Sequence, residues 1–452
     1  MPIGINVINL QIDNPTISKD YDMKTLNMRL LTVAMTLATT AAGLMAVTRE
    51  GKEEEKVSIV KTTFAGVSMP NPFMLASAPP TTNCEMVARS FDAGWGGAVL
   101  KTMAYDLRMA RNVNPRIAAY KVGKSIHGFT NFELGSPKPI SKWLEDARWL
   151  KERFPEHAVF VSLLHTEGLV EEQWREVTRM FNDAGIDGFE LNFSCSHGMA
   201  EAGGGAQVGG NEEAIKMVTN WVRSETNLPV MPKLPAMVPN IGSKARAAEE
   251  AGADAIATIN TLNSIPGIDI YNFVPYPTVD GKSAFSGMSG RAIKPIALRT
   301  VAQVAKAVNI PVSGIGGIYT WQDAVEFILA GASSLQVCSA VMENGYKCVE
   351  AMNKGLLKYM EEMGFETISD FVGKALPNIT AHNNLSRTYK LHAECDETKC
   401  IGCSRCVAVC SDSAYSAINM DGKHASVDAA KCDGCGLCTQ VCPAGALSMK
   451  VR

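Results

Sequence analysis

Short apolar runs alternate with amphipathic stretches from Val57 to about Gly364. This alternation is typical of repeated strand and helix units around a parallel sheet. Eight apolar runs predict strands at 73–77, 97–101, 158–164, 188–192, 229–234, 255–260, 311–314 and 334–338. Apolar residues recur at three and four positions in the stretches that predict helices, at 142–153, 171–183, 212–224, 292–307 and 321–329. Eight such units in this length favour an α/β fold of the TIM-barrel type over an open sheet.

The same pattern divides the chain into four parts, which we predict as an N-terminal extension (1–56), the barrel (57–364), a linker (365–394) and a C-terminal domain (395–452). The extension contains an uncharged run, Leu30 to Thr48, preceded by Lys24 and Arg29. Its length is near the minimum for spanning a membrane, about 17 to 20 residues. No small-residue cleavage site and no twin-arginine pair accompany it, which favours a buried or partner-contacting helix over an export signal. After the barrel, residues 342–363 predict one long helix.

The C-terminal part contains an internal repeat of cysteines. Each half reads C-x-x-C-x-x-C-x-x-x-C, and the second half ends in the C-P pair of ferredoxins. Four thiolates from a tight loop suit a [4Fe-4S] cubane, whereas zinc ribbons use paired C-x-x-C knuckles. In two-cluster ferredoxins the fourth cysteine of each run ligates the other cluster. We therefore assign one cluster to Cys400, Cys403, Cys406 and Cys442, and the other to Cys432, Cys435, Cys438 and Cys410.

Composition and charge limit the classes of partner and the redox environment that we expect for the chain. With 452 residues, 46% of them hydrophobic, and a net charge of -3, the chain can bury a large core and shows no electrostatic sign of a nucleic-acid or membrane partner. Eight of the 13 cysteines have metal-ligand spacing, which favours a reducing, cytoplasmic setting over disulfides. The other five are expected to be small buried hydrophobes, and among them only Cys195 lies where chemistry is plausible.

A flavin is expected in the barrel, because clusters pass single electrons and two-electron chemistry needs a converter. The loops after strands seven and eight of a TIM barrel commonly bind phosphate, and here they carry Gly316-Gly317 and Cys338-Ser339. Lys101 and Lys233 end the second and fifth strands, where a cation could stabilise a reduced flavin. Ordinary tight turns and solvated lysine heads are the alternative interpretations. No strand-linked G-x-G-x-x-G with a downstream acid is present, so NAD(P)H must be bound by another chain.

These motifs, together with Asn71-Pro72-Phe73, Asn192-Phe193-Ser194-Cys195, Asn260-Thr261 and Ser289-Gly290, resemble the dihydropyrimidine dehydrogenase family. The likeness is to the FMN and iron–sulfur subunit of the bacterial two-subunit enzyme, whose barrel is related to dihydroorotate dehydrogenase. The resemblance implies a partner subunit that binds FAD and NAD(P)H, and an oligomer. It places FMN at the C-terminal mouth of the barrel, in contact with Ala76, Ser77, Lys101, Lys233, Ser289, Gly290, Gly316, Gly317, Cys338 and Ser339. It also implies that a small planar substrate is read by Asn131, Asn192, Asn260 and Thr261, since an amide offers both a donor and an acceptor.

One position breaks the family pattern. Reduction of a ring C=C bond needs a hydride from the flavin and a proton from an acid, which in this family is a loop cysteine. The matching position here is Val208, which cannot donate a proton. Three hypotheses remain: His165, His197 or Glu201 replaces the acid, with Lys233 assisting; the substrate is another conjugated ring or enoyl compound; or the chain is an electron-transfer subunit of a larger complex.

Overall fold

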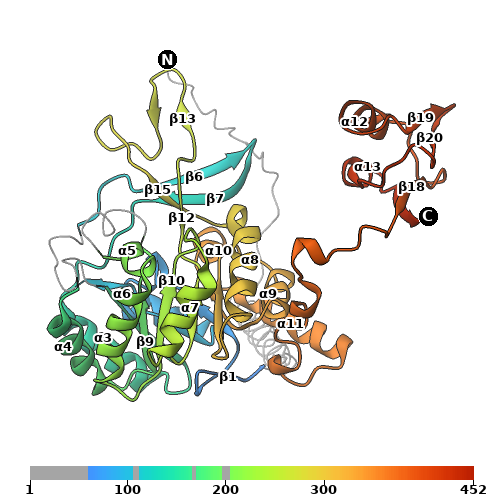
Figure 1. Ribbon diagram of the computed structural model, residues 1–452. Coiled ribbons are helices and arrows are strands. Elements are labelled where there is room, and N and C mark those ends of the chain that lie inside the picture. The colour runs from blue at the N-terminus through green and yellow to red at the C-terminus, as the bar shows by residue number, and fades with distance from the viewer. Residues whose placement is uncertain (1–59, 105–110, 165–168, 196–203) are drawn as a thin grey trace, which may run out of the picture. The chain divides into compact units, whose positions relative to one another are not determined.

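The computed structural model describes residues 60–104, 111–164, 169–195 and 204–452 (Figure 1). The chain divides into two compact units, with the boundary between Val372 and Gly373 and the short segment Leu329–Gly331 grouped with the second. The apolar helix predicted in residues 1–56 lies outside the described residues. Within the ranges described, no helix is both long and apolar enough to cross a membrane.

Eight parallel strands of the first unit close into a barrel. In chain order they are β3 (Phe73–Leu75), β4 (Gly97–Val99), β8 (Ala158–Leu164), β9 (Gly188–Asn192), β10 (Val230–Leu234), β11 (Ile256–Thr258), β16 (Val312–Ile315) and β17 (Ala332–Val337). Each strand pairs with the next in the chain, and β17 pairs with β3 to close the ring. The predicted TIM barrel is therefore confirmed, and β8 and β9 have the predicted bounds.

Helices alternate with these strands along the chain. They are α2 (Cys84–Asp92), α3 (Ile140–Arg153), α4 (Glu171–Asn182), α6 (Glu212–Arg223), α7 (Ile241–Glu250), α8 (Lys294–Ala305), α9 (Trp321–Leu329) and α11 (Cys348–Met363). All five predicted helices are present, but the sequence pattern missed α2 and α7. Helix α7 buries Ile241 and three alanines, so it lacks the bulky apolar stripe by which a helix is recognised.

The single helix predicted over residues 342–363 is wrong. The segment forms α10 (Ser339–Asn344) and, after a break, α11. Gly345 ends α10 with φ 76°, a left-handed conformation that glycine adopts without steric cost and that stops an α-helix.

The two ends of the barrel differ. At one end the hairpin of β1 (Thr62–Phe64) and β2 (Val67–Met69) packs Phe64 and Met69 against Phe160 in the barrel core. At the other end lies an antiparallel sheet in the order β12 (Leu262–Ser264), β15 (Ser286–Ser289), β7 (Ser125–Asn131) and β6 (Ile117–Val122) (Figure 1). A short hairpin of β13 (Ile268–Asp269) and β14 (Val274–Pro275) follows β12. The sheet, which the sequence pattern did not predict, extends beyond the barrel end that Figure 1 shows uppermost.

The second unit is built from two similar halves. Strand β18 (Leu391–Cys395) pairs with β21 (Leu447–Val451), and β19 (Ile418–Asp421) pairs with β20 (His424–Val427). Helices α12 (Arg405–Ser413) and α13 (Leu437–Val441) each follow a cysteine-rich loop. A small core of Ala393, Ile418 and Leu447 joins the halves, and the cysteines pack around it.

Candidate active site and cluster sites

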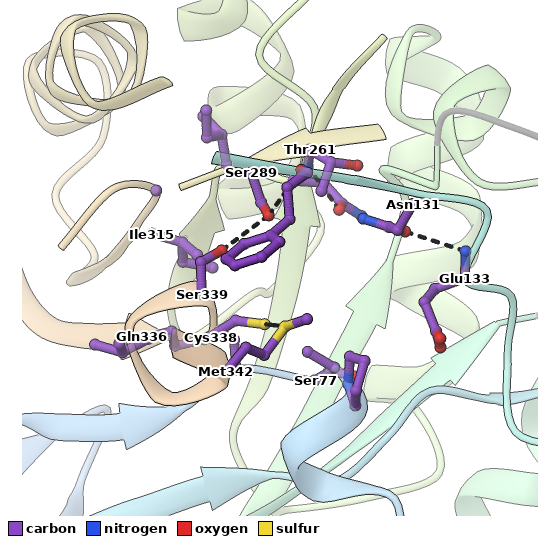
Figure 2. Close-up of a pocket in the computed structure, with 18 of the residues that line it drawn as sticks. Ser77, Asn131, Glu133, Thr261, Ser289, Ile315, Gln336, Cys338, Ser339 and Met342 are labelled. Atoms are coloured by element: carbon purple, nitrogen blue, oxygen red, sulfur yellow. Dashed lines mark hydrogen bonds between the residues drawn. The ribbon is translucent and has the colours of Figure 1, made fainter. Parts of the chain in front are cut away.

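A cavity lies at the C-terminal ends of the barrel strands, beneath the antiparallel sheet. Its volume is about 1080 Å³ when the open mouth is included. All ten predicted FMN contacts line this cavity, as do the four residues predicted to read the substrate. Figure 2 shows Ser289 and Ser339 together on one side of the cavity and Asn131 with Glu133 on the other. We call these two sides the serine side and the amide side.

A chain of hydrogen bonds crosses the ends of four barrel strands. Ser77 Oγ lies 2.9 Å from Thr102 Oγ1, which accepts from Asn192 Nδ2 at 3.2 Å. Asn192 Oδ1 accepts from Ser194 Oγ at 3.1 Å, and Ser194 Oγ accepts from Asn260 Nδ2 at 3.0 Å. Because each side chain is oriented by its neighbours, the two amides are presented to the cavity in a defined orientation.

Asn131 reaches the same cavity from the end of β7, in the antiparallel sheet. Its Nδ2 donates to the Gly287 carbonyl at 3.0 Å, and its Oδ1 accepts from the Glu133 backbone N–H at 3.1 Å. An amide has two N–H groups and two lone pairs, so one of each remains for a ligand.

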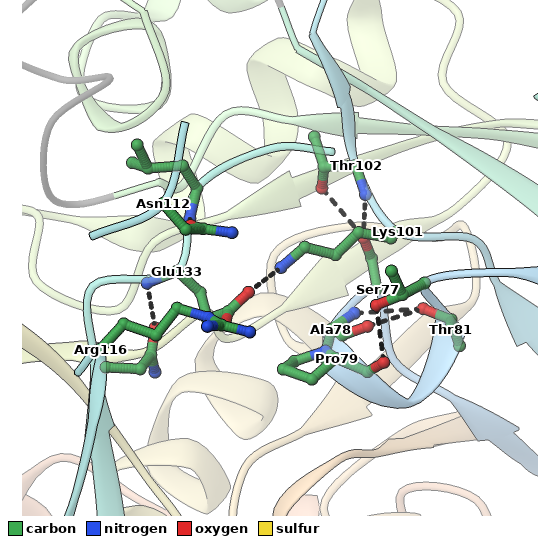
Figure 3. Close-up of polar contacts among 12 residues, drawn as sticks. Ser77, Ala78, Pro79, Thr81, Lys101, Thr102, Asn112, Arg116 and Glu133 are labelled. Atoms are coloured by element: carbon green, nitrogen blue, oxygen red, sulfur yellow. Dashed lines mark hydrogen bonds and ion pairs between the residues drawn. The ribbon is translucent and has the colours of Figure 1, made fainter. Parts of the chain in front are cut away.

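Glu133 is a charged residue of the site that sequence reasoning missed (Figure 3). Lys101 Nζ lies 2.8 Å from its Oε2, and Arg116 Nε donates to its Oε1. Burial by itself would raise the pKa of Glu133, but the two cations overcome this and hold that pKa below its usual value. The carboxylate therefore stays ionised at neutral pH. A signal was available, since Glu133 stands two residues from Asn131 and so points to the same side of an extended chain.

A second buried ion pair joins the neighbouring strands β9 and β10 inside the barrel. Lys233 Nζ is 3.5 Å from Glu190 Oε1, and Gln336 Nε2 donates to Glu190 Oε2 at 2.9 Å. Lys233 and Gln336 line the cavity. Sequence reasoning missed Glu190, although a charge between Phe189 and Leu191 in the strand Gly188–Asn192 was a signal for it.

The serine side brings together backbone segments from three separate loops. Ser339 Oγ donates to Ser289 Oγ at 2.8 Å. Gly316 and Gly317 have φ 124° and 82°, and a Cβ on Gly317 would lie 2.7 Å from Lys294 Cβ. Only glycine therefore lets this loop pass so close to α8. Burial raises the pKa of the adjacent Cys338 thiol to about 11, so that thiol is neutral.

The structure describes only some of the residues considered as the proton donor. His165, His197 and Glu201 lie outside the described residues. Val208 lies in the short helix α5 (Ala206–Gly209), where it is 5% exposed and does not line the cavity. Cys195 does line the cavity and packs against Leu164 and Leu134.

In the second unit the eight predicted cluster cysteines surround two small cavities. One is lined by Cys400, Cys403, Cys406 and Cys442, and the other by Cys410, Cys432, Cys435 and Cys438. The fourth cysteine of each run thus faces the cavity of the other run. This is the crossed arrangement that the spacing predicts for a two-cluster ferredoxin.

The barrel cavity has features that fit FMN. Glycine backbone lines its serine side, two lysines line its wall, and the buried Oε1 of Gln336 has no hydrogen-bond partner among the described residues. A barrel with such a mouth, joined to a cysteine-rich cluster unit, defines a flavin- and iron–sulfur-dependent oxidoreductase.

Comparison with known proteins supports the same class of oxidoreductase. The family model described as "Dihydroorotate dehydrogenase" matches residues 59–360, and that of the "4Fe-4S dicluster domain" matches 393–449. The NAD-dependent dihydropyrimidine dehydrogenase subunit PreA of Escherichia coli (strain K12) is 40% identical over 372 residues, 80% of this chain and 87% of that protein. The chloroplastic dihydropyrimidine dehydrogenase (NADP(+)) of Arabidopsis thaliana is 36% identical over 73% of this chain and 80% of its own length. The catalytic subunit of dihydroorotate dehydrogenase B (NAD(+)) of Pyrococcus abyssi is 36% identical over 70% of this chain and 99% of its own length.

The chain therefore belongs to the dihydroorotate dehydrogenase family and carries a C-terminal 4Fe-4S dicluster domain. It is an oxidoreductase that acts on CH–CH bonds and uses FMN and iron–sulfur clusters, which confirms the resemblance drawn from the motifs.

Proposed function

We propose that the chain is the FMN and iron–sulfur subunit that reduces, or in the reverse direction oxidises, the C=C bond of a neutral pyrimidine-like ring. Electrons travel through two [4Fe-4S] clusters to or from a partner subunit that binds FAD and NAD(P)H. The relatives named as NAD-dependent enzymes support such a partner, and the thiolate-bound clusters support a reducing, cytoplasmic location.

The observation that carries this proposal is the convergence of three asparagines on one cavity. Asn131, Asn192 and Asn260 come from different strand ends and are each oriented by protein hydrogen bonds. A lactam ring presents alternating N–H and C=O groups, which free amide donors and acceptors match. Thr261 completes this edge of the cavity.

Glu133 favours a neutral ring over a carboxylated one. Among the described residues, Lys101 and Arg116 are two cations of the amide side, and each is paired with this carboxylate. A ring that carries its own carboxylate would have to compete for those cations and would approach a buried anion. A neutral pyrimidine neither competes for the cations nor brings a second negative charge close to Glu133.

FMN, when bound, supplies the hydride chemistry, and the residues of this chain prepare for it. Gly316, Gly317 and Ser339 line the cavity and would hold the phosphate, and Lys101 and Lys233 would stabilise negative charge on the flavin ring. The antiparallel sheet contributes Phe129 and Asn131 to the cavity wall, and it would limit the access of water to the reacting atoms.

The proton requires an acid at the substrate. Cys195 is a candidate because its thiol can donate and because it lines the cavity directly after Asn192 and Ser194. His165, His197 and Glu201 remain candidates beside it. Cys195→Ala should lower turnover of the ring about 100-fold or more while photoreduction of the bound flavin stays normal. Normal turnover by Cys195→Ala would return the role to the other three.

The test of the proposed function is anaerobic reoxidation of the reduced full-length chain. Uracil and thymine should restore the oxidised flavin spectrum, and orotate, which is carboxylated, should do so at least tenfold more slowly. If neither uracil nor thymine reoxidises the flavin, the proposal fails. Faster reoxidation by orotate would reverse the argument from Glu133.

A second candidate is an electron-transfer subunit without its own substrate. The valine at position 208, where the family has its acid, favours it. This candidate predicts that only partner proteins reoxidise the flavin, and that no small ring does.

A further inference from the structure

Glu190 is a carboxylate in the interior of the barrel. Its side chain is 0% exposed and lies between Phe189 and Leu191 on β9. A buried carboxylate is costly unless it is paired and hydrogen-bonded, so its partners indicate what it does. Among the described residues these partners are two, Lys233 and Gln336.

Both partners line the FMN cavity, whereas Glu190 itself does not. Lys233 is 5% exposed, and Glu190 is its ion-pair partner within the described ranges. An ammonium has three N–H groups, and the contact with Glu190 at 3.5 Å uses at most one of them, so others are available for a ligand on the cavity side. Glu190 therefore acts as a counter-charge behind the lysine.

The same carboxylate determines how Gln336 is oriented. An ionised carboxylate only accepts hydrogen bonds, so the glutamine must turn its NH₂ group towards Glu190. The Oε1 atom of Gln336 is then directed away from Glu190. This buried oxygen has no hydrogen-bond partner in the described part of the chain. Leaving a buried acceptor unpaired is energetically unfavourable. A ligand N–H in the cavity would remove that cost.

We infer that Glu190 is a positioning residue for FMN. It orients the Lys233 ammonium and the Gln336 acceptor oxygen towards the bound cofactor, and its negative charge makes the flavin harder to reduce than it would be with the lysine alone. The inference concerns the cofactor and not the ring substrate, so it stands or falls separately from the proposed function.

The decisive variant is Glu190→Gln, which preserves shape and removes the charge. Reduction adds negative charge to the flavin, so loss of a nearby anion should favour the reduced form. We expect the ratio of the Kd for oxidised FMN to that for reduced FMN to rise about tenfold, which corresponds to about 30 mV for a two-electron couple. The measurement is FMN titration of the full-length apoprotein in both redox states, alongside anaerobic potentiometry of the holoprotein.

Two further variants separate charge from packing. Glu190→Asp retains the charge and should shift the midpoint potential by less than half as much as Glu190→Gln. Gln336→Met removes the acceptor, so it should weaken oxidised and reduced FMN together, about tenfold, with little change in potential. The matched control is Ser334→Ala on the same strand, which deletes a buried hydrogen bond to Ser313 away from the cavity and should change neither quantity.

An unchanged or lower potential in Glu190→Gln, with FMN still bound, would overturn the inference. So would equal shifts in Glu190→Gln and Glu190→Asp. If Glu190→Gln does not fold, Gln336→Met decides: FMN affinity equal to that of Ser334→Ala refutes the role, and selective weakening supports it.

Discussion

The two cofactor regions of this protein are assembled in opposite ways. In the second unit, each cluster cavity takes three of its cysteines from one loop of seven residues, such as Cys400 to Cys406, and one from the other half. In the barrel, the residues around one cavity run from Ala76 to Met342 and come from every strand end. Local spacing therefore defines the first kind of site, while the second exists only when the barrel closes. The two regions should respond differently to substitution.

The largest effect is expected in the cluster unit. Cys435→Ser removes one of the four thiolates that line its cluster cavity, and three thiolates hold a [4Fe-4S] cubane poorly. Iron content should fall by about half, and turnover driven by the proposed NAD(P)H-dependent partner should fall about 100-fold or more, because the proposed electron route is cut. Iron and sulfide analysis with low-temperature EPR measures this. FMN content should remain unchanged.

Cys395→Ser is the matched control for that experiment. Cys395 lies in the same unit, on β18, but lines neither cluster cavity. Iron content should stay within error of the wild type. A loss equal to that in Cys435→Ser would mean that the ligand assignment from spacing is incomplete.

In the barrel, we expect loss of one asparagine from the hydrogen-bond chain across the strand ends to lower activity less than loss of a cluster ligand. The loss of activity should still be larger than that caused by a surface substitution. Asn192→Ala removes the hydrogen bonds of Asn192 to Thr102 and Ser194 and, with them, the proposed contact with the ring. Lost transition-state hydrogen bonding of about 2–3 kcal/mol corresponds to a fall in kcat/KM of about 30- to 150-fold. Steady-state kinetics on uracil tests this. Asn182→Ala, which loses one hydrogen bond to the Glu225 carbonyl outside the cavity, should leave kcat/KM unchanged.

Glu133→Gln should change preference more than rate. It releases Lys101 and Arg116, so a carboxylated ring gains cations and loses a repulsive anion. We expect the ratio of orotate to uracil reoxidation rates to rise about tenfold, close to the 1.4 kcal/mol of one strong charged contact. Asp146→Asn provides a control, because it weakens a buried pair with Lys138 away from the cavity. An unchanged ratio in Glu133→Gln would show that Glu133 does not discriminate.

The smallest effect is expected at Val208, the position that the resemblance matches to the family's acid. Val208→Cys would introduce that cysteine, but Val208 is buried in α5 and does not line the cavity. Activity on uracil should therefore stay within about twofold of the parent, and stability should fall by less than about 1.5 kcal/mol. A large gain in dihydropyrimidine activity would show that this loop reaches the cavity and that only the acid was missing.

The residues that sequence reasoning missed share a physical cause. Glu133, Glu190 and Gln336 matter because of partners 17 to 146 positions away in the chain, and no periodicity reveals such a pairing. The antiparallel sheet over the cavity was missed for the same reason, since β7 pairs with β15 across 156 positions between Asn131 and Gly287. The break at Gly345 was overlooked because the apolar pattern continues through it.

The sequence by itself determined the features that depend on neighbours in the chain. Apolar runs and helical periodicity predicted the eight barrel strands and five of the helices, because burial of one face imposes a period on each element. Cysteine spacing predicted the two cluster cavities, because a cubane needs thiolates within one tight loop. Strand-end lysines and glycines indicated the flavin end of the barrel.

Only the tertiary structure decided which of those residues meet. Barrel closure brings Lys101 to Glu133 and Lys233 to Glu190, and removes Val208 from the cavity while leaving Cys195 in it. The reason is that burial makes each charge depend on a specific partner, and such partners are chosen by strand register and loop packing and not by position in the chain.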